Sequence, residues 1–365
     1  MNKLILSLAF LAFLASSLAT LAQTLKPGFS KAEYLECLCM ASHMDSLSVD
    51  SKYLSPAPKS FHKVYVSPNV GFDNAWELWQ DDKTGVMAIM TRATVSTTIS
   101  WGANFNAAMV RAVGVAHVGA DKRYDLCADS LACVHAGWVA GLMTMADDIF
   151  AHLDSCVKAG RCDFLISGHS QGGALAYLAT AMLRRAQAKG LIPQDVRFKT
   201  YTSAAPKPGD YLFALNYEAM TQPGWSFSVV NADDWVPETP LSLQRPVDFR
   251  PTNPFTHMDE MLAKLRPIQR LKIKVLYSKV SKPVQTEVEN WTKYLGKTLG
   301  GMLEEQKPWF RQPDYVECVN FARTGNFVVL LPDAEYYAAH PAVADDAFEH
   351  HQYNAYYDLA VKLPE

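Results

Sequence analysis

The sequence predicts an α/β fold with a mostly parallel sheet that helices cover on both faces. Short apolar segments bounded by turn residues, such as 163–168 (DFLISG) and 225–234 (WSFSVVNADD), are typical of buried strands. Longer segments with apolar residues at helical spacing lie between them, notably 134–160 and 172–189. Strands that alternate with helices along a chain form parallel sheets, because each connecting helix crosses one face of the sheet.

The other elements of this core follow from local patterns in chain order. A helix is expected over 31–44, and a β-hairpin over 75–94, where two apolar runs flank the turn DDKTG. The helix over 134–160 ends at Gly160, and the helix over 172–189 carries basic residues near its C-terminal end and stops at Gly190.

The character of the chain changes after residue 240. Residues 282–310 place a row of apolar side chains on one helical face, and Pro283 suits the first turn of that helix. The row consists of Val284, Val288, Trp291, Leu295, Leu299 and Met302. Residues 317–332 (ECVNFARTGNFVVLLP) are predicted to form a hairpin, and residues 348–363 a loop that leads into a helix.

The first 22 residues have the pattern of an export signal. Lys3 precedes an uncharged apolar run, and small residues precede a cleavage point between Ala22 and Gln23. An uncleaved membrane anchor is the alternative, but Ser16 and Ser17 interrupt the run. We therefore expect a signal peptide over 1–22 and one domain over 23–365, with a helical insertion at about 241–312. The mature protein would be secreted or periplasmic, without a transmembrane span.

Composition excludes one class of partner. The 365 residues are 49% hydrophobic and 19% charged, with a formal net charge of -3 and no long basic run. Nucleic-acid binding is not expected, because phosphate contacts need clustered Lys and Arg.

Seven cysteines in an exported chain favour some disulfides. Cys127 and Cys133 lie close in sequence, as do Cys156 and Cys162, so each pair could close a short loop. The odd number leaves at least one cysteine unpaired within a monomer. No cysteine or histidine spacing typical of zinc sites occurs, so no metal is expected.

The segment Gly168-His169-Ser170-Gln171-Gly172 identifies a candidate nucleophile. It fits G-x-S-x-G, and a predicted strand precedes it while a helix follows. In this context a strained turn lifts the serine hydroxyl above the sheet edge, and the two glycines let the backbones pass closely. The helix N-terminus also points free N–H groups toward the site.

A serine needs a base, and in this arrangement the chain order is serine, acid, histidine. His257, His340, His350 and His351 follow Ser170 far enough along the chain. The pair His350-His351 precedes the C-terminal helix, where a loop can reach back over the sheet, and is therefore preferred.

The acid should follow a strand, and Asp233 and Asp234 do so. A carboxylate there would hold the histidine ring in its working tautomer. The oxyanion hole needs two N–H donors, one from Gln171 and one from the loop after an earlier strand, for which Thr94 is the candidate.

With these residues in place, the chain resembles the class 3, fungal-type lipases of the α/β-hydrolase superfamily. Four segments resemble the family's landmarks in the family's order: MTRATVSTTISW, VHAGW, ISGHSQGGALA and VVNADDWVPETP. The resemblance covers roughly 61–240 and the stretch near His351. It selects Asp234 over Asp233 and His351, with Tyr356 five residues later, over His350, which remains the alternate. Ala93 stands where the family usually has Gly.

The resemblance implies a lipase or esterase that uses Ser170, Asp234 and His351 through an acyl-enzyme, without metal or cofactor. The substrate would be a triacylglycerol or another carboxylic ester, bound at a lipid–water interface. Phospholipase A1 and an esterase for aryl esters are alternatives, and so is a catalytically idle relative that binds a hydrophobic ligand. The oligomeric state is left open.

Two segments are candidates for covering the site. A helix over 104–118 (NFNAAMVRAVGVAHV) could act as a lid or pack on the sheet. The amphipathic helix around Trp291 could act as a cap or pack on the domain.

Overall fold

The computed structural model describes residues 24–44, 50–250, 252–253, 258–341 and 346–364. The predicted signal peptide and His257 lie outside these residues. The strands are β1 (Phe61–Val66), β2 (Trp76–Asp81), β3 (Met87–Thr91), β4 (Met109–Arg111), β5 (Val113–Val118), β6 (Ala120–Asp125), β7 (Cys133–His135), β8 (Asp163–His169), β9 (Arg197–Ser203), β10 (Gly209–Asp210), β11 (Ser226–Asn231), β12 (Phe310–Arg311), β13 (Phe321–Ala322) and β14 (Asn326–Leu330). The helices are α2 (Lys31–Met44), α3 (Thr98–Phe105), α4 (Ala136–Lys158), α5 (Gln171–Ala188), α6 (Tyr211–Thr221), α7 (Met258–Ala263), α8 (Pro267–Trp291), the π-helix η5 (Thr292–Thr298), α9 (Leu299–Gln306), α10 (Ala334–Ala339) and α11 (Tyr353–Ala360). Short 3₁₀ turns are η1 (Ser51–Tyr53), η2 (Val236–Glu238), η3 (Pro246–Asp248) and η6 (Glu349–His351).

The central sheet has seven strands in the order β1-β2-β3-β8-β9-β11-β14. The pairs β1–β2 and β2–β3 are antiparallel, and every pair from β3 to β14 is parallel. The expected α/β fold with a mostly parallel sheet is therefore confirmed. Because β3, β8 and β11 run in the same direction, the loops that follow them meet at one edge of the sheet, which is where ligands bind in open α/β sheets.

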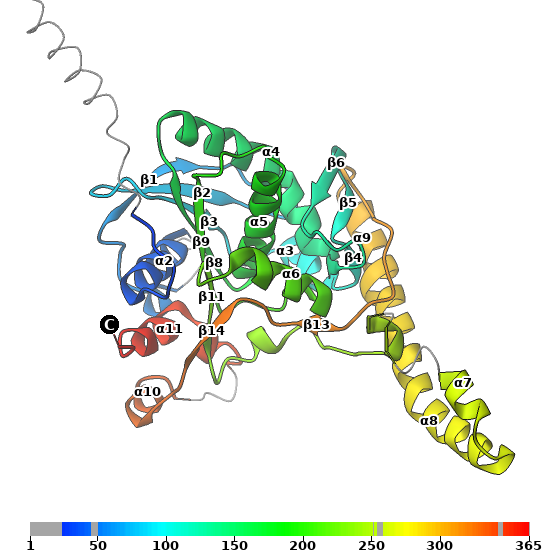
Figure 1. Cartoon of the computed structure of the whole chain (residues 1–365). Coiled ribbons are helices and arrows are strands. Elements are labelled where there is room, and N and C mark those ends of the chain that lie inside the picture. Colours follow the sequence, from blue (N-terminus) through cyan, green and yellow to red (C-terminus); the bar gives the residue numbers. More distant parts are fainter. Residues whose placement is uncertain (1–23, 45–49, 251, 254–257, 342–345, 365) are drawn as a thin grey trace, which may run out of the picture.

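Helices cover both faces of this sheet, with α4 and α5 on one side and α2 and α11 on the other (Figure 1). Successive side chains of a strand point to opposite faces of the sheet, so one strand contributes to the cores on both sides. In β8, Phe164 and Ile166 belong to the core cluster with α4 and α5, whereas Leu165 belongs to the cluster with α2 and α11. Residues of β8 are buried on both faces, which is why its sequence is a continuous apolar run.

Several elements of the core lie where the sequence predicted them. The hairpin over 75–94 is β2 and β3, and Gly85 in its turn has a φ of 71° that suits glycine. The helix predicted over 31–44 is α2. The helices predicted over 134–160 and 172–189 are α4 and α5, with boundaries one or two residues different. The loop and helix at 348–363 are η6 and α11.

The helix predicted over 104–118 is wrong. The helix after Thr94 is α3, and the chain then forms β4 and β5, which pair with β7 and β6. The valines at 110, 113, 115 and 118 explain the outcome, because β-branched side chains favour strands. The apolar composition indicated burial, but the spacing of the apolar residues was interpreted as helical although the segment forms strands.

Two predictions after residue 240 are also wrong. Pro283 does not begin a helix but lies inside α8, which starts at Pro267. The run of Lys, Leu, Ile and Gln before Pro283 favours helix strongly enough to continue through the proline. Residues 317–332 do not form a hairpin, since β13 pairs with β10 in a small sheet while β14 extends the main sheet beside β11. The segment between Asp234 and His351 does hold α7, α8 and α9, but its boundaries as an insertion at about 241–312 stay a prediction.

The seven cysteines are free thiols in the structure. The neighbours considered from the sequence, Cys127 with Cys133 and Cys156 with Cys162, are not bonded. Cys133 instead lies beside Cys318, which is 185 residues away in the sequence. Their Sγ atoms and a carboxylate oxygen of Asp210 lie within 4.8 Å of one another, and all three residues are buried.

In an oxidising compartment, such as the one the predicted signal peptide implies, we expect Cys133 and Cys318 to be joined. To form the bond, the sulfurs must approach from within 4.8 Å to about 2.05 Å, and each thiol gives up one proton and one electron to a disulfide oxidant. Peptide mapping after alkylation, without reduction, should recover the linked pair, and Cys318→Ser should lower the free energy of unfolding by about 3 kcal/mol. Two alkylated thiols, or one zinc ion bound per chain, would contradict this prediction.

Candidate active site

Ser170 lies on the sharp turn between β8 and α5. Its φ of 56° and ψ of -127° are strained for a residue with a side chain, as expected for a nucleophile held on such a turn. A Cβ added to Gly168 would lie 2.4 Å from the backbone of Gly172, and one added to Gly172 would lie 2.2 Å from the carbonyl oxygen of Thr91. Both glycines are therefore required by close approach of three backbone segments.

The three residues predicted for catalysis form one chain of hydrogen bonds. Nε2 of His351 lies 2.8 Å from Oγ of Ser170, and Nδ1 of the same ring lies 2.7 Å from Oδ2 of Asp234. Asp234 is buried, and two further groups hold its carboxylate. The hydroxyl of Tyr356 donates to Oδ2 at 2.7 Å, and the backbone N–H of Val236 donates to Oδ1 at 2.9 Å.

The alternative histidines and the alternative acid considered from the sequence make their contacts away from Ser170. Nδ1 of His350 lies 2.8 Å from the hydroxyl of Tyr336, and Oδ2 of Asp233 accepts a hydrogen bond from the exposed Tyr337. His340 is buried between two carboxylates, with Nδ1 at 3.0 Å from Glu349 and Nε2 at 2.9 Å from Asp358. None of these side chains contacts Ser170.

Thr94 and Gln171, the predicted oxyanion residues, flank Ser170 along one cavity. Within the described part of the chain, neither backbone N–H donates a hydrogen bond, so both are free for a ligand oxygen. Ala93, where the family usually has Gly, is not among the described residues with positive φ, so its methyl group causes no backbone strain there.

Asn104 joins the two oxyanion residues and escaped the sequence analysis. Its Nδ2 donates to Oγ1 of Thr94 at 2.9 Å, and its Oδ1 accepts from Nε2 of Gln171 at 2.7 Å and from Nε1 of Trp138 at 2.9 Å. Asn104 is the penultimate residue of α3, and no local motif marks it. Its role arises only where α3 packs against the starts of α4 and α5.

His169 contacts the backbone of His351 and the side chain of Ser203. Its buried ring lies 2.8 Å from the backbone carbonyl of His351 through Nε2 and 3.1 Å from Oγ of Ser203 through Nδ1. Burial first, and the nearby His351 ring second, hold the pKa of His169 well below its usual 6.5. A neutral ring facing a carbonyl must carry its proton on Nε2, so His169 donates to the loop that bears His351.

The family described as class 3 lipases matches residues 88–244, a segment that includes Ser170, Asp234, Thr94 and Asn104. Residues 88–244, about two fifths of the chain, are therefore similar to the class 3 lipase family.

Three individual proteins are similar to the chain at low sequence identity. A secreted mono- and diacylglycerol lipase from Fusarium solani is 32% identical over 108 residues, which is 29% of each chain. The chain therefore matches less than a third of that relative's length. Among solved structures, the lipase–propeptide complex of Rhizomucor miehei is 20% identical with a TM-score of 0.43, over 59% of this chain and 66% of that one. Lipase II of Rhizopus niveus is 19% identical with a TM-score of 0.42, over 58% and 74%.

An apolar cavity of about 240 Å³ lies beside Ser170. Aromatic and aliphatic side chains supply most of its wall: Trp101, Phe105, Trp138, Trp235, Val236, Leu241, Trp291, Leu295 and Phe348. A second cavity of about 170 Å³ also reaches Ser170 and is lined by His169, His351 and Tyr353. Trp101 and Phe348 belong to both walls, so the nucleophile lies where the two cavities meet.

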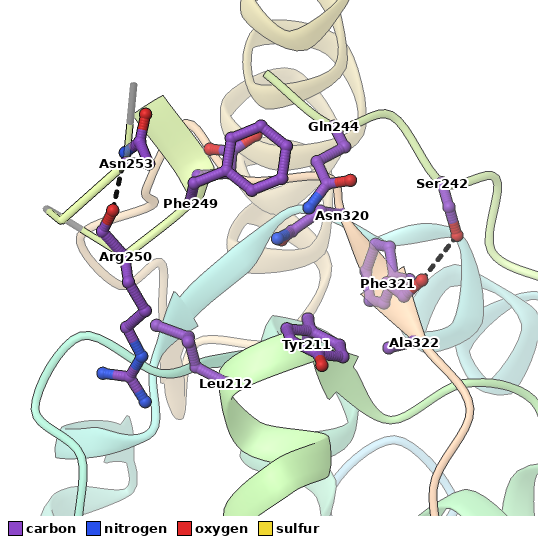
Figure 2. A pocket seen from close by; sticks show the side chains of 11 residues that line it. Tyr211, Leu212, Ser242, Gln244, Phe249, Arg250, Asn253, Asn320, Phe321 and Ala322 are labelled. Atoms are coloured by element: carbon purple, nitrogen blue, oxygen red, sulfur yellow. Dashed lines mark hydrogen bonds between the residues drawn. The ribbon is translucent and has the colours of Figure 1, made fainter. Parts of the chain in front are cut away.

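A larger cavity lies away from Ser170. It measures about 730 Å³ and is lined by the start of α6, by residues 320–322, and by Ser242, Gln244, Asp248, Phe249, Arg250 and Asn253. Figure 2 shows Tyr211, Phe249 and Phe321 around it, and none of its lining side chains comes from Ser170, Asp234 or His351. The candidate active site is therefore the pair of smaller cavities that reach Ser170.

Stability should fall as the pH falls, because two histidines are buried in neutral form. Burial lowers the pKa of His135 to about 3 and that of His169 well below 6.5, so below pH 6.5 the unfolded chain takes up protons that the folded chain does not. Burial raises the pKa of Asp210 to about 6, so this carboxyl binds its proton first in the folded chain and offsets one histidine. The free energy of unfolding should then drop by about 1.4 kcal/mol per pH unit between about pH 6 and about pH 4.5.

Urea denaturation across this range measures the effect. Asp210→Asn removes the offset and keeps the hydrogen bond to the N–H of Phe213 at the start of α6, so its slope should be about twice the wild-type slope. A wild-type stability that stays level or rises toward pH 4.5 would show that one of these histidines is charged in the folded protein.

Proposed function

We propose that the chain is an exported serine ester hydrolase that cleaves the carboxylic esters of lipids. The observation that carries the proposal is the continuous hydrogen-bonded chain from Ser170 through His351 to Asp234, placed at the mouth of an apolar cavity. An apolar wall suits an acyl chain, and the class 3 lipase match over residues 88–244 supports the same substrate class.

In the first half-reaction, Ser170 attacks the ester carbonyl carbon while Nε2 of His351 takes its proton. Asp234 holds Nδ1–H of the ring and stabilises the imidazolium that forms. The free N–H groups of Thr94 and Gln171 receive the negative charge on the carbonyl oxygen. His351 then gives the proton to the leaving alcohol, and an acyl-serine remains.

In the second half-reaction, water takes the place of the alcohol. His351 removes a proton from the water as it attacks the acyl carbon, and then returns a proton to Oγ of Ser170 as the acid leaves. The cavity of about 170 Å³ beside His351 and His169 is positioned to hold the alcohol and later the water. The larger apolar cavity is positioned to hold the acyl chain.

The size of the acyl cavity favours short and medium chains. A volume of 240 Å³ holds on the order of eight groups of the size of water. Trp101 and Phe105 of α3 are exposed at its rim and Trp291 closes another side, so longer chains require these side chains to move.

A fluorophosphonate probe tests the proposal, since it labels only an activated serine. The mature protein should be labelled, and peptide mapping should place the label on Ser170. Hydrolysis of p-nitrophenyl esters should favour butyrate and octanoate over palmitate. If the protein is neither labelled nor active, even with detergent present to open the site, it is an idle relative that binds a hydrophobic ligand. A preference for phospholipids or for aryl esters would identify the other hydrolases of this fold.

Asn104 should act by positioning the oxyanion hole. Asn104→Ala leaves the side chains of Thr94 and Gln171 without their shared partner, so we expect kcat to fall about tenfold with KM little changed, less than the loss of a direct oxyanion donor. Steady-state kinetics on p-nitrophenyl butyrate measures the effect.

Asn106→Ala is the matched control. Asn106 is buried and Asn104 partly buried, but the Asn106 side chain bonds Tyr315 and the carbonyl oxygens of Leu295 and Gly296 rather than the oxyanion residues. It should lose stability and keep its kcat. Equal losses of kcat in both variants would show that Asn104 acts only through folding.

A further inference from the structure

The part of the chain least covered by other elements is a helical arm, formed by α7 and the first part of α8 (residues 258–282). Figure 1 shows these two helices projecting from the body of the molecule, with α7 beside α8. From 263 to 276 every residue is exposed except the partly buried Arg270. Lys274 and Asp259 form an ion pair that ties the two helices together.

The arm exposes an unusual amount of aliphatic surface. Ile268 is 71% exposed, and Leu276 and Val280 are each 67% exposed. The other exposed apolar side chains of the arm are Met261, Leu265, Leu271, Ile273 and Val275. Single exposed leucines are ordinary on a soluble protein, but eight exposed apolar side chains within one short arm indicate a surface that another molecule covers.

The arm also concentrates positive charge. It holds seven Lys and Arg against two acidic residues, although the whole chain has a formal net charge of -3. Lys272, Lys279 and Lys282 are exposed on the same side of α8 as Ile268 and Val275, and among the described residues none of the three has an ion-pair partner. The exposed side therefore alternates long cations with aliphatic groups.

We propose that the helical arm docks the protein on an anionic lipid surface, an inference that rests on the proposed lipid ester hydrolysis. Aliphatic side chains can enter the boundary between head groups and acyl chains. Lysine stems can lie along that boundary while their ammonium groups reach lipid phosphates. The aliphatic groups therefore suit the acyl-chain boundary of such a surface, and the lysines suit its phosphate groups.

The same features disfavour two other occupants. A second copy of the chain would bring another arm of the same positive charge against the first, and no complementary acidic row faces outward on the arm. Nucleic acid would satisfy the charge but would leave the aliphatic groups in contact with phosphate and water. A lipid surface accommodates both.

The other end of α8 connects the arm to the active site. Trp291, the last residue of α8, donates from Nε1 to the carbonyl oxygen of Ala107 at 2.8 Å and lines the cavity beside Ser170. Leu295, one turn later, lines the same cavity. A lipid surface that holds α8 therefore lies against the element that forms one wall of the acyl cavity.

Vesicle sedimentation tests the proposal directly. The full mature chain should bind vesicles of equal parts phosphatidylglycerol and phosphatidylcholine, bind more weakly at high salt, and bind poorly to phosphatidylcholine alone. Replacing Lys272, Lys279 and Lys282 together by Gln should lower the partition coefficient about a hundredfold, since each cation at an anionic surface contributes about fivefold. The same three changes at Lys26, Lys59 and Lys83, exposed lysines outside the arm, should leave binding almost unchanged.

A second variant tests the aliphatic part. Ile268, Leu271 and Val275, which lie on the same side of α8 as the three lysines, replaced together by Ser should also lose vesicle binding, while hydrolysis of soluble p-nitrophenyl butyrate stays at the wild-type rate and shows that the site is folded. Binding that survives in both arm variants overturns the proposal, as does an arm-dependent dimer in sedimentation equilibrium or tighter binding to DNA than to vesicles. If the wild type binds vesicles but hydrolyses no ester, the proposed function fails while docking stands.

Discussion

Replacing either Ser170 or His351 by alanine is expected to lower kcat for ester hydrolysis by about 10⁶-fold, and the double variant should be no slower than the single ones. The two side chains are joined by a hydrogen bond of 2.8 Å and act in the same proton transfer. Once either the nucleophile or its base is removed, the remaining residue can no longer contribute to the reaction. What rate remains comes from binding and from the oxyanion N–H groups.

The adjacent His350 provides the control. It has the same chemistry and lies one residue away, but its ring faces Tyr336 and its carbonyl oxygen accepts from Asn231. His350→Ala should keep most of the activity and lose some stability instead. Steady-state rates on p-nitrophenyl butyrate, with circular dichroism to check folding, measure all four variants. A larger loss in His350→Ala than in His351→Ala would reverse the assignment of the base.

Asp234→Asn should lower kcat by about 10⁴-fold while the fold is kept. The amide is the same size, but it can present N–H toward Nδ1 of His351, which favours the wrong tautomer and removes the negative charge that stabilises the imidazolium. Tyr356 and Val236 donate to the carboxylate from other sides, so the substituted side chain is held in place.

Asp233→Asn is the matched control for this substitution. Asp233 is the preceding residue of the same loop, is exposed, and contacts Tyr337 rather than the histidine. Its activity should stay within about twofold of wild type, because an exposed group outside the site contributes little to the reaction. The pH dependence of kcat/KM should also change only in Asp234→Asn. If both variants lose activity equally, the loop is important as a structure and no single carboxylate supports the base.

The helix and strand framework was predictable where one local pattern determined each element. A strand of apolar residues, a strained serine between two glycines and an Ala-rich helix lie within about thirty residues, and backbone sterics act over that range. The errors occurred where the choice depended on distant partners. Residues 106–118 could bury their apolar groups as a helix or as strands, and pairing with β6 and β7 decided for strands.

The sequence by itself determined which serine is the candidate nucleophile and the expected order of its partners, and resemblance to a family chose Asp234 and His351. Only the tertiary structure showed that His351 reaches Ser170 while His350 turns to Tyr336, that Asn104 links Thr94 to Gln171, and that Cys133 meets Cys318 rather than Cys127. It also showed that α8 begins sixteen residues before Pro283 and leaves the body of the protein. The physical reason is that a turn is specified by neighbouring residues, whereas the partner of a side chain is specified by how distant segments pack.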